Sequence, residues 1–133
     1  MDIKIVPAYE SREEVRILFT EYTNMLIEND ASFKEYLNIQ NYDEEIHHLE
    51  EKYGQPGGRL YLIYCDTELA GCIGLRKISK QFCEMKRLYI RPAFRGQKLG
   101  NRLVEQLIAD AKEIGYSSML LDTLPFLQSA IHL

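Results

Sequence analysis

The sequence predicts an α/β fold in which helices flank one mixed, twisted sheet, with a single domain over residues 1–133. A chain of 133 residues with 46% apolar residues can bury one ordinary core. Strand-like runs alternate with amphipathic helical stripes, and the clearest stripe precedes an apolar segment typical of a buried parallel strand. The expected order of elements is β-α-α-β-β-β-α-β-α.

The N-terminus is expected to form a strand and then a helix. Ile3 and Ile5 alternate with polar neighbours, as in a short strand. Ser11 and Glu14 have the spacing of a capping box, which opens a helix, and the helix is predicted to end near Asn29. Its buried face is expected to consist of Val15, Leu18, Phe19, Tyr22 and Leu26.

A second helix is expected from Asn41 to about Gly54, with Glu44 at the reciprocal capping position. Its opposite face is acidic. The residues expected to be buried are Ile46, Leu49 and Tyr53. The breaker Gln-Pro-Gly-Gly at 55–58 then separates this helix from the strands that follow.

Three strands are predicted in the middle of the chain. Residues 60–65 and 69–75 are apolar runs separated by a polar turn, which indicates an antiparallel hairpin, and residues 82–90 continue as a third strand. Along the third strand the apolar side chains change parity: they are Cys83 and Met85, then Leu88 and Ile90. Because side chains alternate strictly along a strand, this change predicts a β-bulge.

The C-terminal part carries the clearest helical stripe, which Gly115 ends. The stripe consists of Leu99, Leu103, Val104, Leu107, Ile108 and Ala111. Residues 118–122 are short and apolar, as expected for a parallel strand after a crossover helix. Pro125 suits the first turn of a last helix.

Charge is unevenly distributed along the chain. The net charge is -4, but residues 1–56 carry 5 basic and 13 acidic residues, whereas residues 57–133 carry 11 and 7. Residues 76–102 hold nine basic residues against one acid, Glu84. This stretch is expected either to bind an anionic ligand or to form a solvated basic face. A pI of about 5.4 argues against broad nucleic-acid binding.

The cysteines, histidines and apolar runs narrow the class of protein further. Cys65, Cys72 and Cys83 have no C-x-x-C spacing and lie in apolar stretches, so reduced core thiols and a cytoplasmic location are expected. No apolar run approaches the ~20 residues that span a bilayer, so no membrane insertion is expected. His47 and His48 project about 100° apart around a helix, which suits metal binding poorly. No metal is therefore expected.

The turn at residues 95–100, Arg-Gly-Gln-Lys-Leu-Gly, links a strand to a helix and forms a potential anion site. The first helical N–H groups have no intrahelical acceptors, and Gly96 and Gly100 let the backbone approach a ligand. Arg95 and Lys98 add positive charge. On these residues alone, a purely structural turn remains an alternative.

Residues 84–100, Glu-Met-Lys-Arg-Leu-Tyr-Ile-Arg-Pro-Ala-Phe-Arg-Gly-Gln-Lys-Leu-Gly, resemble the core of the GNAT acetyltransferase superfamily. The resemblance continues through the helical stripe and through residues 121–125 and 130–133. The family's signature is Arg or Gln, two free positions, Gly, one free position, then Gly or Ala. Arg95 and Gly100 fit this signature, whereas Lys98 occupies the position of its first glycine.

The resemblance implies an N-acetyltransferase that takes acetyl-CoA as co-substrate and acetylates a primary amine of a small molecule or protein in a ternary complex. Leu88, Tyr89 and Ile90 would contact pantetheine through their backbone. The pyrophosphate would be held by Arg95, Gly96, Gln97, Lys98, Leu99, Gly100 and Asn101. The Leu88 amide would also stabilise the oxyanion, and Glu84 would accept the proton of the amine. The alternative for Glu84 is an ion pair on an exposed face. The acidic N-terminal helices would attract a cationic amine.

The sequence also departs from the family pattern. Leu127 replaces a common asparagine, and relatives continue beyond the position of Leu133 with a tyrosine that serves as general acid and with two further strands. The resemblance therefore implies a domain that lacks its C-terminal end, with weakened activity and an open edge at residues 118–122 that favours a homodimer. A catalytically silent acyl-CoA-binding or dimerisation module is the main alternative. A P-loop or dinucleotide-binding domain is disfavoured, since neither glycine motif is present.

Overall fold

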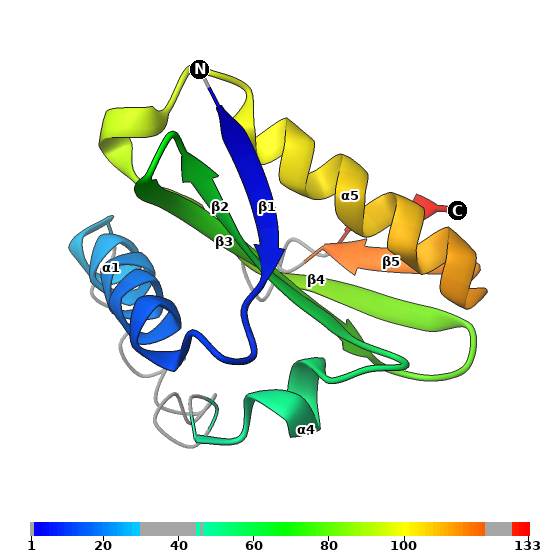
Figure 1. The fold of residues 1–133 in the computed structure, drawn as a ribbon. Coiled ribbons are helices and arrows are strands. Elements are labelled where there is room, and N and C mark those ends of the chain that lie inside the picture. The colour runs from blue at the N-terminus through cyan, green and yellow to red at the C-terminus, as the bar shows by residue number, and fades with distance from the viewer. Residues whose placement is uncertain (1, 30–44, 46, 122–128) are drawn as a thin grey trace.

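In the computed structural model, the protein folds around a six-stranded mixed sheet with the order β1-β2-β3-β4-β5-β6 (Figure 1). The structure describes residues 2–29, 45, 47–121 and 129–133. The strands are β1 Ile3–Pro7, β2 Arg59–Cys65, β3 Glu68–Lys77, β4 Phe82–Ile90, β5 Ser118–Leu121 and β6 Ser129–His132. Neighbouring strands are antiparallel except β4 and β5, which are parallel. The predicted hairpin and the predicted parallel strand are thus confirmed.

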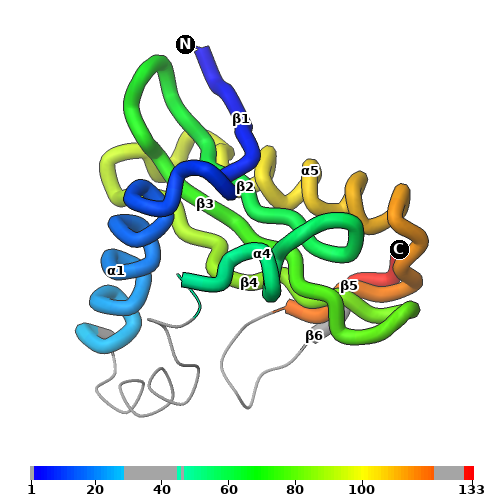
Figure 2. The backbone as a smooth tube through the Cα atoms, turned by 60° about the horizontal axis from the view of Figure 1, so that its bottom comes forward, coloured from blue at the N-terminus to red at the C-terminus, as the bar shows by residue number. Residues whose placement is uncertain are grey.

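Helices cover both faces of the sheet (Figures 1 and 2). Helices α1 (Arg12–Asn29) and α4 (Leu49–Tyr53) pack on one face, and α5 (Leu99–Ile114) packs on the other. A short 3₁₀ turn, η1 (Pro92–Phe94), leads from β4 toward α5. The core under α1 and α4 contains Val15, Leu18, Phe19, Leu49, Tyr53, Leu60, Leu62 and Cys72. The core under α5 contains Ile63, Ile73, Leu75, Cys83, Leu103, Leu107 and Met119.

The predicted boundaries of the first and last long helices are confirmed. Helix α1 begins directly after Ser11 and ends at Asn29. Helix α5 ends at Gly115, whose φ of 108° places it in the left-handed region and whose N–H donates to the Ala111 carbonyl at 3.1 Å. A residue without a Cβ adopts this conformation without steric cost, so glycine is the residue that suits the position.

The second predicted helix is confirmed only in its last part. Leu49 and Tyr53 are buried in α4, and the helix ends before Gly54, as expected. The expected start at Asn41, the capping residue Glu44 and the expected core residue Ile46 lie outside the described residues.

The predicted bulge in β4 is present. Cys72 pairs with Tyr89 and Gly74 pairs with Lys86, so two steps along β3 correspond to three steps along β4. Arg87 lies at the extra position with a φ of 59°. Because of the extra residue, apolar side chains on both sides of the bulge reach the α5 core despite their different parity: Cys83, Met85, Leu88 and Ile90.

The expectation of a last helix is wrong for residues 129–132, which form β6. This strand pairs antiparallel with β5, from Ser118 opposite His132 to Leu121 opposite Ser129. The backbone groups of β5 on that side thereby gain partners along the sheet, so the edge that was expected to be open is covered (Figure 2). Pro125 lies outside the described residues.

The three cysteines lie in the core, as their apolar surroundings predict. All three thiols are free and buried. Within the described part of the chain, each helix is too short or too polar to cross a bilayer.

Candidate functional site

Strand β4 extends beyond its parallel neighbour β5, so one edge of β4 has no neighbouring strand near the bulge among the described residues. The β4–β5 pairing runs from Phe82 opposite Ser118 to Met85 opposite Leu121, where the described part of β5 ends. The predicted binding residues Leu88, Tyr89 and Ile90 lie beyond this point, after the bulge. The backbone groups of this segment that face the β5 side therefore have no strand partner among the described residues. The Ile90 carbonyl accepts a hydrogen bond from Arg95 Nε, and the others can serve an extended ligand.

A cavity of about 320 Å³ lies where the turn after β4 meets the start of α5. It is lined by Ile90, Phe94, Arg95, Gly96, Lys98, Leu99, Gly100 and Asn101. The structure thus brings together one end of β4 and most of the predicted pyrophosphate loop. Gln97 is the exception, since its side-chain oxygen lies 4.0 Å from the Cys65 sulfur. Leu88 and Tyr89 do not line this cavity either.

Lys98 adopts the left-handed backbone conformation that the turn into α5 requires. Its φ is 63° and its ψ is 23°, in the left-handed region, and its carbonyl accepts the first helical hydrogen bond of α5, from the Arg102 N–H at 3.2 Å. A non-glycine residue adopts this conformation at a cost of roughly 1–2 kcal/mol. Together with Gly96 at a φ of 83°, Lys98 turns the chain into α5, whose first residues line the cavity and carry N–H groups without intrahelical acceptors.

The Arg95 side chain is held at the junction between β4 and the loop. Its Nε donates to the Ile90 carbonyl at 2.9 Å, and its guanidinium carbon lies 5.9 Å from the centre of the Tyr89 ring. This tether fixes the loop relative to the end of β4. Nη2 of Arg95 also donates to the Met25 sulfur at 3.4 Å. The other guanidinium N–H groups and the loop amides can donate to an anion.

Glu84 lies before the bulge and on the face opposite α5, because its neighbours Cys83 and Met85 both pack in the α5 core. One carboxylate oxygen lies 3.5 Å from Arg76 Nη1 and 3.8 Å from Lys86 Nζ. The Glu84 side chain is 18% exposed. The ion pairs that were the alternative to a catalytic role are therefore present, and the carboxylate keeps limited access to solvent.

The interaction that holds the bulge is not evident from the sequence. The Arg87 side chain is buried, and its Nε and Nη2 donate to the two carboxylate oxygens of Glu45 at 3.0 and 3.1 Å. Lys52 also donates to Glu45, and the Arg87 guanidinium carbon lies 5.9 Å from the ring centres of Phe19 and Tyr22. The signal in the sequence was the change of parity between Met85 and Leu88, which predicts a bulge but does not identify the partner of Arg87.

The pairing sets the protonation state of Glu45. Burial alone would raise the pKa of this carboxyl, but attraction by Arg87 and Lys52 and their hydrogen bonds outweigh burial, so its pKa lies below the ordinary value of 4.5. Glu45 is therefore a carboxylate at neutral pH, and its charge faces two cations inside the protein.

A second ion pair joins α1 to the end of β4. Arg91 donates from Nε and Nη2 to the Glu21 carboxylate at 3.1 and 2.9 Å, and the Tyr89 hydroxyl lies 3.2 Å from the same group. Two acids of the N-terminal half thus neutralise arginines: Glu45 pairs with Arg87 in β4, and Glu21 pairs with Arg91, directly after β4. Neither is available as a free negative charge for a cationic ligand.

Cys72 and Cys83 do not offer a nucleophile. Burial raises the pKa of Cys83 to about 11 and that of Cys72 to about 12, so both are neutral at physiological pH. Among the described residues there is no group of three or more His, Cys, Asp or Glu side chains that could hold a metal ion. His47 and His48 are exposed, and His48 lies 3.6 Å from Glu51.

Comparisons with known proteins agree with this geometry. A sequence profile of the acetyltransferase (GNAT) family matches residues 19–133. An uncharacterized N-acetyltransferase of Dictyostelium discoideum is 35% identical over 192 aligned positions, which cover 98% of this chain and 86% of that protein.

Solved structures show the same fold. An acetyltransferase from Streptococcus agalactiae superposes with a TM-score of 0.72 at 21% identity, over 93% of this chain and 74% of that one. The PaiA N-acetyltransferase from Thermoplasma acidophilum, solved with coenzyme A, superposes with a TM-score of 0.64 at 22% identity, over 91% and 79% of the two chains.

Replacing Glu45 with Gln should strongly destabilise the protein, because it removes the carboxylate charge that faces the buried Arg87 guanidinium. We expect the free energy of unfolding to fall by about 3–5 kcal/mol in reversible urea denaturation. Glu50→Gln is the matched control, since this carboxylate is 54% exposed and pairs with Arg12 at 3.4 Å. Its replacement should cost less than about 1 kcal/mol. Similar small losses in both variants would contradict the role given to Glu45.

The ion pair of Glu45 with Arg87 should make the protein less stable in acid. Because the pKa of Glu45 is lower in the folded state, its contribution is fully present above pH 4.5 and is lost as pH falls through the folded-state pKa. Urea titrations of the wild type and of Glu45→Gln between pH 7 and about 3 should therefore converge toward low pH. A difference between the two proteins that stays constant over this range would count against the ion pair.

Proposed function

Because the chain belongs to the acetyltransferase (GNAT) family, we propose that it transfers an acetyl group from acetyl-CoA to a primary amine by direct attack in a ternary complex. The family and the relatives support acetyl transfer as the activity. The observation that carries the finer proposal is the continuity of the strand edge at 88–90 with the anion cavity at the start of α5.

The two parts of this continuous surface suit the two parts of coenzyme A. The N–H groups at the start of α5 and the charges of Arg95 and Lys98 would hold the pyrophosphate. The edge of β4 at Leu88, Tyr89 and Ile90 would hold pantetheine through backbone hydrogen bonds, in the manner of an added strand. Acetyl-CoA in this position brings its thioester toward the bulge.

Acetyl transfer then requires one proton acceptor and one oxyanion donor. The amine nitrogen attacks the thioester carbonyl, the new C–N bond forms, and the C–S bond breaks as coenzyme A leaves. We assign to Glu84 the removal of one proton from the substrate ammonium, directly or through one water, so that the neutral amine can attack; the Leu88 N–H stabilises the oxyanion that forms. The departing thiolate takes up a proton and leaves as the free thiol.

A catalytically silent acyl-CoA-binding module is the second candidate. The ion pairs of Glu84 with Arg76 and Lys86 favour it, because they give this carboxylate a structural role that needs no catalysis. Binding of acetyl-CoA alone does not separate the two candidates, whereas turnover does.

Calorimetric titration with acetyl-CoA, followed by a thiol-release assay over a panel of amines, tests the proposed function. We expect saturable binding and amine-dependent release of coenzyme A. Binding without release from any amine would favour the silent module. A folded protein that binds no acetyl-CoA would overturn both readings.

Replacing Glu84 with Gln tests the assignment of the base. The amide cannot accept the ammonium proton, so kcat should fall by roughly 10²–10⁴ while the Kd for acetyl-CoA stays near the wild-type value. Glu105→Gln, an exposed change on α5, is the control and should keep the wild-type kcat. An unchanged kcat in Glu84→Gln would remove Glu84 from the mechanism and leave it a structural ion pair.

A further inference from the structure

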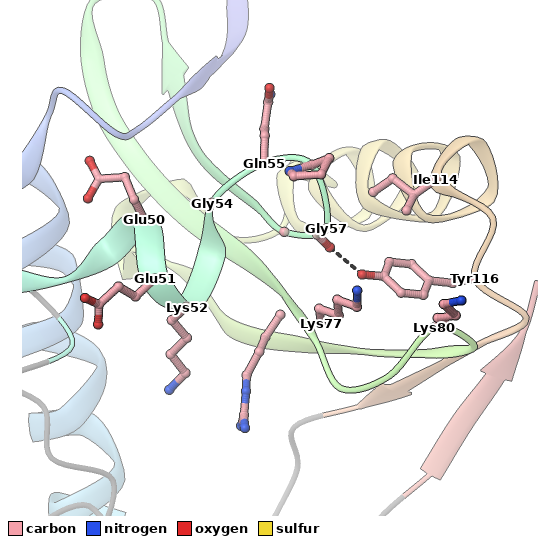
Figure 3. Close-up of a pocket in the computed structure, with 13 residues that line it drawn as sticks. Glu50, Glu51, Lys52, Gly54, Gln55, Gly57, Lys77, Lys80, Ile114 and Tyr116 are labelled. Carbon is pink, nitrogen blue, oxygen red and sulfur yellow. Dashed lines mark hydrogen bonds between the residues drawn. The ribbon is translucent and has the colours of Figure 1, made fainter.

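A cavity of about 750 Å³ lies beside α4, but it does not reach the residue assigned as base (Figure 3). Lys77 and Lys80 lie beside the Tyr116 ring at one end of this cavity (Figure 3). Lys77 is opposite Cys83, which packs in the α5 core, so its side chain is on the α5 side of the sheet. Glu84 is on the other face and does not line the cavity. An acceptor at Glu84 therefore meets a different surface.

Three apolar side chains lie beside Glu84 on the face of the sheet opposite α5. Phe82 is two positions before Glu84 in β4, so the two side chains share this face at a separation of about 6.6 Å along the strand. Leu120 lies directly opposite Glu84 in the parallel β4–β5 register. Ile78 is two positions after Arg76, the β3 partner of Glu84, and the Ile78 N–H donates to the Phe82 carbonyl at 3.0 Å. Ile78, Phe82 and Leu120 form what we call the apolar patch.

The side chains of the apolar patch remain available to a ligand. Phe82 is 41% exposed and Ile78 is 44% exposed; with Ile17 on α1 they are the large apolar side chains that stay exposed among the described residues. Leu120 is half-buried and packs in neither core of the described residues. Contact of apolar surface with water is unfavourable, and neighbouring exposed apolar side chains are typical of binding surfaces.

The charges around Glu84 favour an uncharged group on the acceptor. Arg76 Nη1 and Lys86 Nζ lie 3.5 and 3.8 Å from the Glu84 carboxylate. A second ammonium group on the acceptor would be repelled by these two cations, and a carboxylate would compete with Glu84 for them. The acids Glu21 and Glu45 are already matched by arginines.

We propose that the apolar patch binds the apolar part of the acetyl acceptor, so that the preferred acceptors are primary amines carried on an apolar chain. The proposal rests on the proposed acetyl transfer and specifies its substrate class. Along β4 the order is the edge for acetyl-CoA at 88–90, the bulge, Glu84 and then Phe82. An acceptor whose chain lies on the patch thus presents its amine at Glu84, on the side from which the thioester approaches. The patch touches no reacting atom and only orients the amine.

A comparison of chain lengths tests the substrate class. Ethylamine and hexylamine have similar basicity and differ only in apolar length. A fully buried methylene favours binding about fourfold, and the patch is partly open, so we expect kcat/KM to be at least about tenfold higher for hexylamine. Equal kcat/KM for the two amines would overturn the proposal.

A comparison of end groups separates an apolar preference from a preference for charge. Hexylamine, 1,6-diaminohexane and 6-aminohexanoate have the same chain length and end in a methyl, an ammonium and a carboxylate group. We expect hexylamine to have the highest kcat/KM of the three. A higher value for the diamine or for the amino acid would show that charge selects the acceptor and would overturn the proposal.

Variants then locate the effect on the patch. Phe82→Ala should lower the ratio of kcat/KM for hexylamine to that for ethylamine by about fivefold or more. Phe82→Leu keeps most of the apolar area and should keep most of this ratio. Ile17→Ala is the matched control, because Ile17 is 38% exposed and lies on α1, outside the patch. An unchanged ratio in Phe82→Ala, or an equal fall in Ile17→Ala, would contradict the patch. The Kd for acetyl-CoA and the Tm report whether each variant retains its fold.

A binding measurement separates failure of this proposal from failure of the proposed function. With coenzyme A present, calorimetry of the amines needs no turnover. Tighter binding of hexylamine than of ethylamine, lost in Phe82→Ala, supports the patch even if no amine releases coenzyme A. Turnover without a preference for hexylamine overturns the patch and leaves acetyl transfer intact. A protein that neither binds hexylamine nor releases coenzyme A overturns both.

Discussion

The bidentate pair of Arg87 with Glu45 is the interaction on which the arrangement of β4 depends. Arg87 occupies the extra position of the bulge in a left-handed conformation, which is unfavourable for a residue with a Cβ. Two hydrogen bonds to a buried carboxylate, with two aromatic rings nearby, hold the side chain in place. This fixes where the alternation of β4 changes. Glu84 consequently faces α4, whereas Leu88 and Ile90 reach the α5 side.

The ion pairs also divide the basic stretch at 76–102 into two groups. Arg87 and Arg91 are matched by Glu45 and Glu21, so they connect the strand to the N-terminal half of the chain. Lys98, by contrast, lies at the cavity before α5, and Lys77 and Lys80 lie at the cavity beside α4. A count of charges along the sequence treats these residues alike. Their partners in space decide which of them can bind an anion.

This division explains which parts of the structure could be predicted from the sequence. Strands β1 to β5, α1, α5 and the bulge were predictable because their signals are local: alternation, helical spacing, a capping residue and a glycine stop. The partner of Arg87 was not predictable, because it lies 42 residues away and isolated charges usually indicate a solvated surface.

The failed expectation of a last helix has the same cause. Pro125 is a local helix signal. The pairing of β6 with β5 instead satisfies the backbone N–H and C=O groups at the edge of β5, and a local pattern does not reveal this long-range requirement. The loop at 95–100 shows the converse. Lys98 departs from the glycine expected of the family signature, and the structure nevertheless retains the left-handed turn. The loop geometry therefore depends on where the chain must go between β4 and α5, and glycine only lowers its cost.

The surface that we propose for acetyl-CoA lies between β4 and the start of α5, within residues 88–101. The cavity beside α4 is lined largely by residues 50–58, the end of β3 and Tyr116. Glu84 lines neither cavity, and its neighbour Arg76 lines the second. The two surfaces therefore depend on different segments of the chain. Glu45 acts on the first of them, because its pair with Arg87 holds the bulge that precedes residues 88–90.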